Sequence, residues 1–236
     1  MASRNCLDSP DSYAIAWIAA LPIERAAAEA MLDEEHAAPS SFIRHQTDAN
    51  VYTWGRMGEH NIVIASLAAG VYGTTSAATT ASSLLASLPS IRVDLMVGIG
   101  GGIAQPTDDR DIRLDDIVVS QPDSTTGGVC QYDLIKARSG DKRERKGFLG
   151  RPPAVLLHAL ASIQADHERK DSKVPCFLQT NVIVRDSTDN HVALLTGWFR
   201  SQLSPVCRNR IKLALKADRR GYKIIILTFS RRALDH

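Results

Sequence analysis

Apolar runs separated by glycine-rich or polar breaks dominate the first hundred residues of the chain. Residues 13–20 form a continuous apolar run, which predicts a buried strand, and residues 23–32 are rich in alanine with glutamate and methionine, which predicts a helix. Residues 51–56 and 61–67 have the composition of consecutive strands, and the turn between them contains Gly58. The pattern therefore predicts a strand, a helix and then a hairpin.

A second set of strands and a helix follows the hairpin. Residues 69–73 break the strand pattern with two glycines, and residues 74–88 predict a helix of small residues. Residues 93–97 are the next apolar strand, which runs into a glycine cluster at 98–102, and residues 116–120 are another strand. Strands that alternate with helices in this way predict an α/β layered sheet.

The amino-terminal end and the part beyond residue 120 carry weaker patterns. In chain order they predict a flexible polar tail over 1–12, a turn-rich loop over 124–128, a strand over 131–137, a solvated charge run over 139–146, a helix from 152 to 165, a basic helix-like segment over 201–219 and a strand over 224–229.

Composition places the chain among globular proteins. It has 236 residues, 44% of them hydrophobic, which suffices for one domain, or for one domain and an appendage. A formal net charge of +2 is too small to predict affinity for nucleic acid or a membrane. Four cysteines lie far apart without metal-ligand spacing to histidine, and neither a signal peptide nor the ~20 apolar residues of a membrane span are found. We expect a cytoplasmic protein that uses no metal and no organic cofactor.

The junction between the first strand and the first helix carries one acidic side chain. Pro22 suits the first position of a helix, which places Glu24 in the first helical turn. Because carboxyl ends of strands in α/β sheets face the crevice where ligands bind, Glu24 is a candidate site residue. The alternative is purely structural, since an acidic residue near a helix start is favoured by the helix dipole in any protein.

Two glycine-bearing segments are candidates for backbone contact with a ligand. The cluster at 98–102 lets amides approach an anion or a sugar, although its spacing is neither a dinucleotide fingerprint nor a P-loop. At 69–76 a strand end leads into a helix, where the hydroxyls of Thr74, Thr75 and Ser76 are placed to cap the helix or to meet phosphate. A tight turn with positive φ and a capped packing helix are the structural alternatives.

Short motifs in a fixed order add a more specific signal. They are Ala20-Leu21-Pro22-Ile23-Glu24, Ala69-Gly70-Val71-Tyr72-Gly73-Thr74-Thr75-Ser76-Ala77-Ala78, Gly98-Ile99-Gly100-Gly101-Gly102-Ile103, Asp115-Asp116-Ile117-Val118-Val119-Ser120, Gln131-Tyr132-Asp133 and Arg151-Pro152-Pro153. With this order, residues 13–179 resemble the nucleoside phosphorylase and nucleosidase family, especially the version at the amino terminus of large fungal multidomain proteins. The resemblance implies a three-layer α/β/α nucleoside phosphorylase-like fold with a mixed central sheet, incomplete at the carboxyl end, followed by a basic segment at 180–236 that does not match the family.

This resemblance implies cleavage of the N-glycosidic bond of a purine nucleoside or related compound. By resemblance, Glu24 holds and activates the attacking water, a task that suits a carboxylate because it accepts a proton and favours positive charge nearby. Phosphorolytic members carry Arg and Ser where this chain has Met96 and Ile99, so hydrolysis is expected rather than phosphorolysis. The alternative is a catalytically inactive nucleoside-binding sensor module of a signalling-type protein.

The resemblance also implies a set of site residues and partners. The expected ligand is a small-molecule nucleoside, with phosphate in a phosphorolytic variant, while membranes and nucleic acid are not expected partners; a complete domain is expected to form a homo-oligomer. Glu24 is the expected catalytic residue, and the expected substrate-binding residues are Ala20, Leu21, Ala69, Gly70, Thr74, Thr75, Gly98, Gly100 and Gly101.

The second half of the family's site is not found in this sequence. The Glu-Met-Glu segment that binds the ribose is absent after Gln179, and the aspartate that protonates the base has only a weak counterpart in Asp189 or Asp186. The domain is therefore expected to be truncated. An incorrect gene model with a shifted frame, a degenerate paralogue and a basic nucleic-acid tail are the explanations left open, the last weakened by the lack of interleaved aromatic residues.

Overall fold

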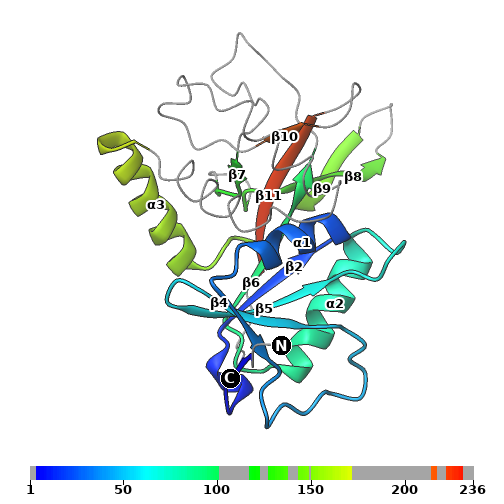
Figure 1. Cartoon of the computed structure of the whole chain (residues 1–236). Coiled ribbons are helices and arrows are strands. Elements are labelled where there is room, and N and C mark those ends of the chain that lie inside the picture. Colours follow the sequence, from blue (N-terminus) through cyan, green and yellow to red (C-terminus); the bar gives the residue numbers. More distant parts are fainter. Residues whose placement is uncertain are drawn as a thin grey trace.

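The computed structural model describes residues 4–100, 117–122, 127–137, 143–148, 150–171, 214–216 and 222–230 (Figure 1). The described part is an α/β structure with a mixed sheet, in the strand order β1-β3-β4-β5-β2-β6-β11-β10, and β7 also pairs with β11. Six of these strands come from residues 4–100. The elements are β1 (Asn5–Cys6), the 3₁₀ helix η1 (Pro10–Ser12), β2 (Ile15–Ala19), α1 (Pro22–Ala30), β3 (Glu34–Ala37), β4 (Thr53–Met57), β5 (His60–Ser66), α2 (Thr74–Ser87), β6 (Val93–Gly100), β7 (Ile117–Val119), β8 (Cys130–Ala137), β9 (Arg143–Phe148), α3 (Ala154–Arg169), β10 (Ala214–Lys216) and β11 (Tyr222–Ser230).

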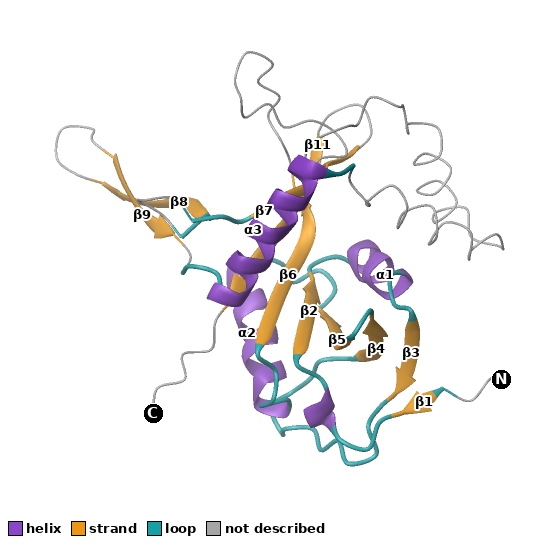
Figure 2. Cartoon of the chain, turned by 90° about the vertical axis from the view of Figure 1, so that its left-hand side faces the viewer, coloured by secondary structure: helices purple, strands orange, loops and turns teal. Residues whose placement is uncertain are grey.

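Strand β2 is the centre of the part that concerns function. It runs parallel to β5 on one side and to β6 on the other, with Ala19 paired to Ser66 and Ile18 paired to Met96. Figure 2 shows β6, β2, β5, β4 and β3 in succession across the sheet. Because β2, β5 and β6 are parallel, their carboxyl ends lie at one edge of the sheet, where ligand sites of α/β proteins form.

The two faces of β2 belong to different apolar clusters. Ala16 and Ile18 pack in a cluster that includes Leu84 of α2, whereas Trp17 packs against a cluster that includes Ala28 of α1. Helices α1 and α2 therefore cover opposite faces of the sheet. A strand covered on both faces carries apolar residues at successive positions, which explains the continuous apolar run in the sequence.

A buried carboxylate joins the loop before β4 to the end of α2. Asp48 is 5% exposed, and its oxygens accept hydrogen bonds from the Tyr52 hydroxyl at 2.6 Å, the Ser87 hydroxyl at 2.5 Å and the Asn50 backbone amide at 2.9 Å. Burial and the hydrogen bond to Asp48 raise the pKa of Tyr52 above its ordinary value. The Tyr52 hydroxyl therefore stays protonated and keeps donating to the carboxylate.

Several elements expected from the sequence are present close to the expected bounds. The hairpin β4–β5 has the expected turn, with Gly58 at φ 58°, and Pro22 occupies the first turn of α1. One expectation about the segment before Tyr13 is corrected. A flexible tail was expected over 1–12, but residues 4–12 include β1 and η1. Strand β1 pairs with β3, and Arg4 forms an ion pair with Glu35 at 2.7 Å.

The glycine cluster after the fourth expected strand is a second correction. Strand β6 continues through Gly98 and Gly100, and neither glycine has a positive φ, so no tight turn occurs at these two positions. The extension has a non-local cause. Strand β11 pairs antiparallel with β6, placing Ile226 opposite Gly98 and Ile224 opposite Gly100, so the glycines have a strand partner.

Three further segments differ from the expectations. Residues 143–146 of the expected charge run lie in β9, because β9 pairs antiparallel with β8 in a separate two-stranded sheet. Within the basic segment expected to be helix-like, residues 214–216 form β10 by pairing with β11. Strand β3 has no counterpart among the expected elements and forms by pairing with β4.

Gly55 in β4 is expected to tolerate no side chain. A Cβ at this position would lie 2.6 Å from the Glu34 carbonyl oxygen of β3 and 2.6 Å from a Leu32 methyl carbon. Because the first of these atoms is backbone, the strands must separate, and we expect Gly55→Ala to lower the free energy of unfolding by about 2 kcal/mol, measured by urea denaturation. Gly150→Ala, with nothing within 4 Å, is the control. Equal stability of the two variants would contradict this prediction.

Candidate functional site

The candidate site lies where the carboxyl ends of β2, β5 and β6 meet the start of α1. Strand β2 ends at Ala19, and Leu21 is the extended N-cap residue of α1 with φ −115° and ψ 150°. Pro22 then fixes the first helical position, and Glu24 follows as the third residue of the helix. The Glu24 side chain is turned back toward the strand ends and is only 7% exposed.

Three backbone amides hold the Glu24 carboxylate. Oxygen Oε2 accepts hydrogen bonds from the amides of Ala20 and Leu21, both at 2.8 Å, and Oε1 accepts one from the amide of Ile99 at 2.7 Å. The first two contacts are local and belong to the capping of α1, whereas the third crosses 75 residues of sequence to β6. Capping alone does not explain that third bond. The carboxylate therefore ties β2, α1 and β6 together at one point.

One acceptor position remains on this carboxylate. An ionised carboxylate offers about four lone-pair positions, of which the three amides use three. Oxygen Oε1 can accept one further hydrogen bond, from a water, a hydroxyl or an N–H group. Among the described residues, no ion pair joins Glu24 to a basic side chain.

The absence of a side chain at Gly98 leaves room for the Glu24 carboxylate. A Cβ on Gly98 would lie 3.1 Å from Oε1 of Glu24 and 3.4 Å from its Cδ. The carboxylate cannot easily move away, because three amides fix it. Glycine at this position therefore serves close approach to a side chain, rather than a turn.

The loop between β5 and α2 lies at the same edge of the sheet. The Leu67 amide donates to the carbonyl oxygen of Ala19 at 3.0 Å, which joins the ends of β5 and β2. After Leu67 the chain passes through Gly70 at φ 80° and Gly73 at φ 102°. Both values lie in the left-handed region, so these two glycines are required by the backbone.

The start of α2 differs from the expected capped helix. Gly73 is the N-cap residue and no side chain caps the helix, while the Ser76 hydroxyl donates to the Val71 carbonyl oxygen at 2.9 Å. The hydroxyls of Thr74 and Thr75 were expected to cap the start, but these residues lie inside the helix, past the position from which a side chain reaches the free amides. Both threonines are exposed.

The expected site residues fall into three groups. Glu24 contacts Ala20 and Leu21 directly and lies against Gly98. The adjacent β5–α2 loop and the first turn of α2 hold Ala69, Gly70, Thr74 and Thr75, and Gly100 lies two residues beyond Gly98 in β6. Gly101, Asp186 and Asp189 lie outside the described residues.

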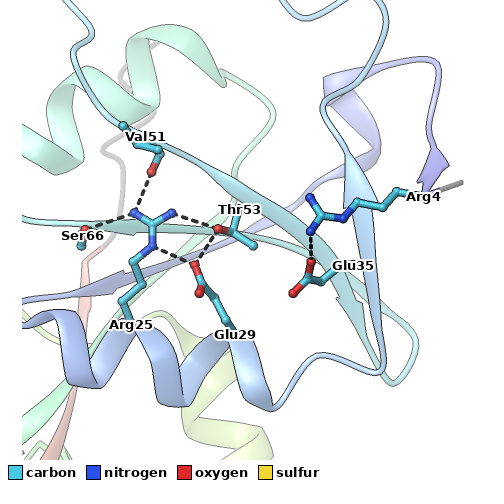
Figure 3. Close-up of polar contacts among 7 residues, drawn as sticks. All are labelled: Arg4, Arg25, Glu29, Glu35, Val51, Thr53 and Ser66. Atoms are coloured by element: carbon cyan, nitrogen blue, oxygen red, sulfur yellow. Dashed lines mark hydrogen bonds and ion pairs between the residues drawn. The ribbon is translucent and has the colours of Figure 1, made fainter. Parts of the chain in front are cut away.

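Arg25 was not among the expected site residues. Its guanidinium donates to the Glu29 carboxylate at 2.8 Å, the Val51 carbonyl oxygen at 3.1 Å, the Ser66 hydroxyl at 3.2 Å and the Thr53 hydroxyl at 2.9 Å (Figure 3). The same view shows the separate ion pair of Arg4 with Glu35. Only the spacing of Arg25 and Glu29, four residues apart, was a signal in the sequence.

The groups that this edge of the sheet offers to a ligand are the Glu24 carboxylate, which accepts hydrogen bonds, and backbone amides, which donate them. In the part of the chain that the structure describes, no group of three His, Cys, Asp or Glu side chains is placed to hold a metal ion. Within the same ranges, none of the helices combines the length and apolar character that crossing a membrane requires.

One comparison with known proteins gives a relative. The chain is 46% identical over 157 residues to a nucleotide-binding leucine-rich repeat (NLR)-like protein of Hyaloscypha variabilis. The match covers 66% of this chain but 15% of the fungal protein, so the chain spans a small part of that relative's length. No family model and no solved structure matches the chain. The chain is thus similar to one region of a fungal NLR-like protein.

Proposed function

We propose that this chain is a nucleoside-binding module similar to one region of a fungal NLR-like protein, and that ligand binding rather than turnover is its main activity. The proposed fold is the three-layer nucleoside phosphorylase-like architecture implied by the ordered motifs. The observation that carries the proposal is the hydrogen bond from the Ile99 amide to Glu24. It brings the acidic motif and the glycine motif, which are far apart in sequence, into contact at the edge of the sheet where ligand sites of α/β proteins form.

A nucleoside fits the chemistry of this edge. Its ribose hydroxyls are donors for the acceptor position left on Glu24, and the open space beside Gly70 and Gly73 in the β5–α2 loop lets a flat base or sugar approach the backbone without obstruction by Cβ atoms. The exposed start of α2 adds amides without a side-chain cap.

Binding is favoured over catalysis by the hydrogen bonding of Glu24. A general base must accept a proton from its water, and three backbone amides already occupy most of this carboxylate. The similarity to part of an NLR-like protein also supports a module whose bound ligand acts as a signal. Hydrolysis of the N-glycosidic bond is the second candidate, because the remaining position on Oε1 suffices for one water.

Thermal unfolding and base release, measured on the same samples, separate these functions. We expect adenosine or inosine to stabilise the full chain by about 2.7 kcal/mol at a concentration of 100 times Kd, which raises Tm by roughly 5–10 °C, without release of free base detected by chromatography. Base release that Glu24→Gln abolishes and Glu59→Gln retains would instead establish the hydrolase, since Glu59 lies exposed in the β4–β5 turn. Absence of both effects would refute the two candidates together.

A further inference from the structure

Helix α1 has few apolar side chains with which to hold its place on the sheet. It is nine residues long, and its buried residues are Glu24 and Ala28. Four of its residues are alanines. A buried methyl or methylene group contributes only about 0.8 kcal/mol, so apolar burial alone fixes the rotation of this helix weakly. The polar contacts of α1 therefore fix its rotation on the sheet.

Those polar contacts reach the strands on both sides of β2. The sheet order is β4-β5-β2-β6, and α1 follows directly from β2. Glu24 binds the Ile99 amide of β6 on one side. Arg25, the next residue, binds Ser66 at the end of β5 and Thr53 at the start of β4 on the other side. The helix is thus fastened to both neighbours of its own strand.

The contacts of Arg25 fix the orientation of its guanidinium plane as well as its distance from the strands. Three of its nitrogens donate to four acceptors, and the Thr53 hydroxyl in turn donates to the Glu29 carboxylate at 2.6 Å, which closes the network (Figure 3). The Arg25 side chain is 18% exposed. A planar guanidinium held at several points resists rotation, which a lysine ammonium does not reproduce.

We infer that Arg25 is a positioning residue for the candidate site: by fixing the rotation of α1, it keeps the Glu24 carboxylate on the amides of Ala20, Leu21 and Ile99 and leaves its last acceptor position available to the ligand. The effect on ligand binding rests on the proposed function. The effect on the Glu24 contacts does not.

Amide hydrogen exchange of the full chain, followed by NMR, tests the inference without a ligand. In Arg25→Met, the Leu21 and Ile99 amides are expected to exchange about tenfold faster relative to the Val63 amide in the centre of β5, because the carboxylate that protects them loses its fixed position. Arg25→Lys keeps the charge but not the planar contacts, and it is expected to show the same selective change at smaller size. The Lys variant alone decides the matter if the Met variant does not fold.

Arg56→Met is the matched control. The Arg56 side chain contacts Glu34 and the Gly58 carbonyl oxygen, neither of which belongs to α1, so its loss is expected to leave the ratio of the Ile99 and Val63 exchange rates unchanged. Unchanged exchange in the Arg25 variants, or uniform acceleration at all amides, would overturn the inference, since uniform acceleration is the signature of general destabilisation.

A calorimetric titration with adenosine adds the functional readout. Arg25→Lys is expected to bind about tenfold more weakly than the wild type, whereas Arg56→Met keeps the wild-type affinity. Equal affinity of Arg25→Lys and wild type would overturn the role in binding. If the wild type itself binds no nucleoside, the proposed function fails, while the exchange result still decides whether Arg25 positions Glu24.

Discussion

Glu24→Ala is expected to lower the free energy of unfolding by about 4 kcal/mol and to abolish nucleoside binding. The substitution removes three hydrogen bonds to a charged acceptor and leaves the amides of Ala20, Leu21 and Ile99 without that partner. Each such bond is worth roughly 1.5–3 kcal/mol, but losses at one site are not additive. For a chain of this size, the change corresponds to a Tm lower by roughly 8–16 °C, measured by calorimetry.

Two further variants make this expectation specific. Glu59→Ala removes an exposed glutamate and is expected to change the free energy of unfolding by less than about 0.5 kcal/mol. Glu24→Gln keeps the shape of the side chain but turns one acceptor oxygen into a donor facing a backbone amide, so an intermediate loss is expected. A loss below about 1 kcal/mol in Glu24→Ala would show that the carboxylate does not join the three elements.

Gly98→Val is expected to have the second largest effect, with a loss of about 3 kcal/mol in unfolding free energy and nucleoside affinity reduced about 100-fold. The new Cβ would lie 3.1 Å from Oε1 of Glu24, and the amides that hold the carboxylate prevent it from yielding. The side chain also fills the space beside the remaining acceptor position. Urea denaturation and calorimetric titration measure the two quantities.

A double-mutant cycle identifies the cause of the Gly98 effect. If the clash is with Glu24, Gly98→Ala must cost less stability in the Glu24→Ala background than in the wild type, because the carboxylate is then absent. Equal costs in both backgrounds would mean that the glycine is required for another reason.

The joint between β2 and α1 could be predicted from the sequence because its causes are local. A continuous apolar run, a proline suited to the first helical position and an acidic residue in the first turn specify a strand, a helix start and the position of Glu24. The hairpin around Gly58 is local in the same sense. The α/β class follows from the alternation of such units.

The remaining features depend on contacts between distant parts of the chain. Strand β6 continues through Gly98 because β11 pairs with it, and no local pattern reveals that partner. The bonds from Arg25 to Val51 and Ser66 cross 26 and 41 residues. The bond from Ile99 to Glu24 is non-local as well, because it joins the acidic residue that caps its own helix to another strand.

An NMR titration of the full chain with adenosine or inosine tests the central claim most directly. If a nucleoside binds beside Glu24, the amide resonances of Ala20, Leu21 and Ile99 shift in a saturable way, because these amides share the carboxylate that contacts the ligand. The resonance of the Asn50 amide, which donates a hydrogen bond to Asp48, is expected not to shift. Saturable shifts confined to other parts of the chain, or no saturable shift at all, would contradict the claim.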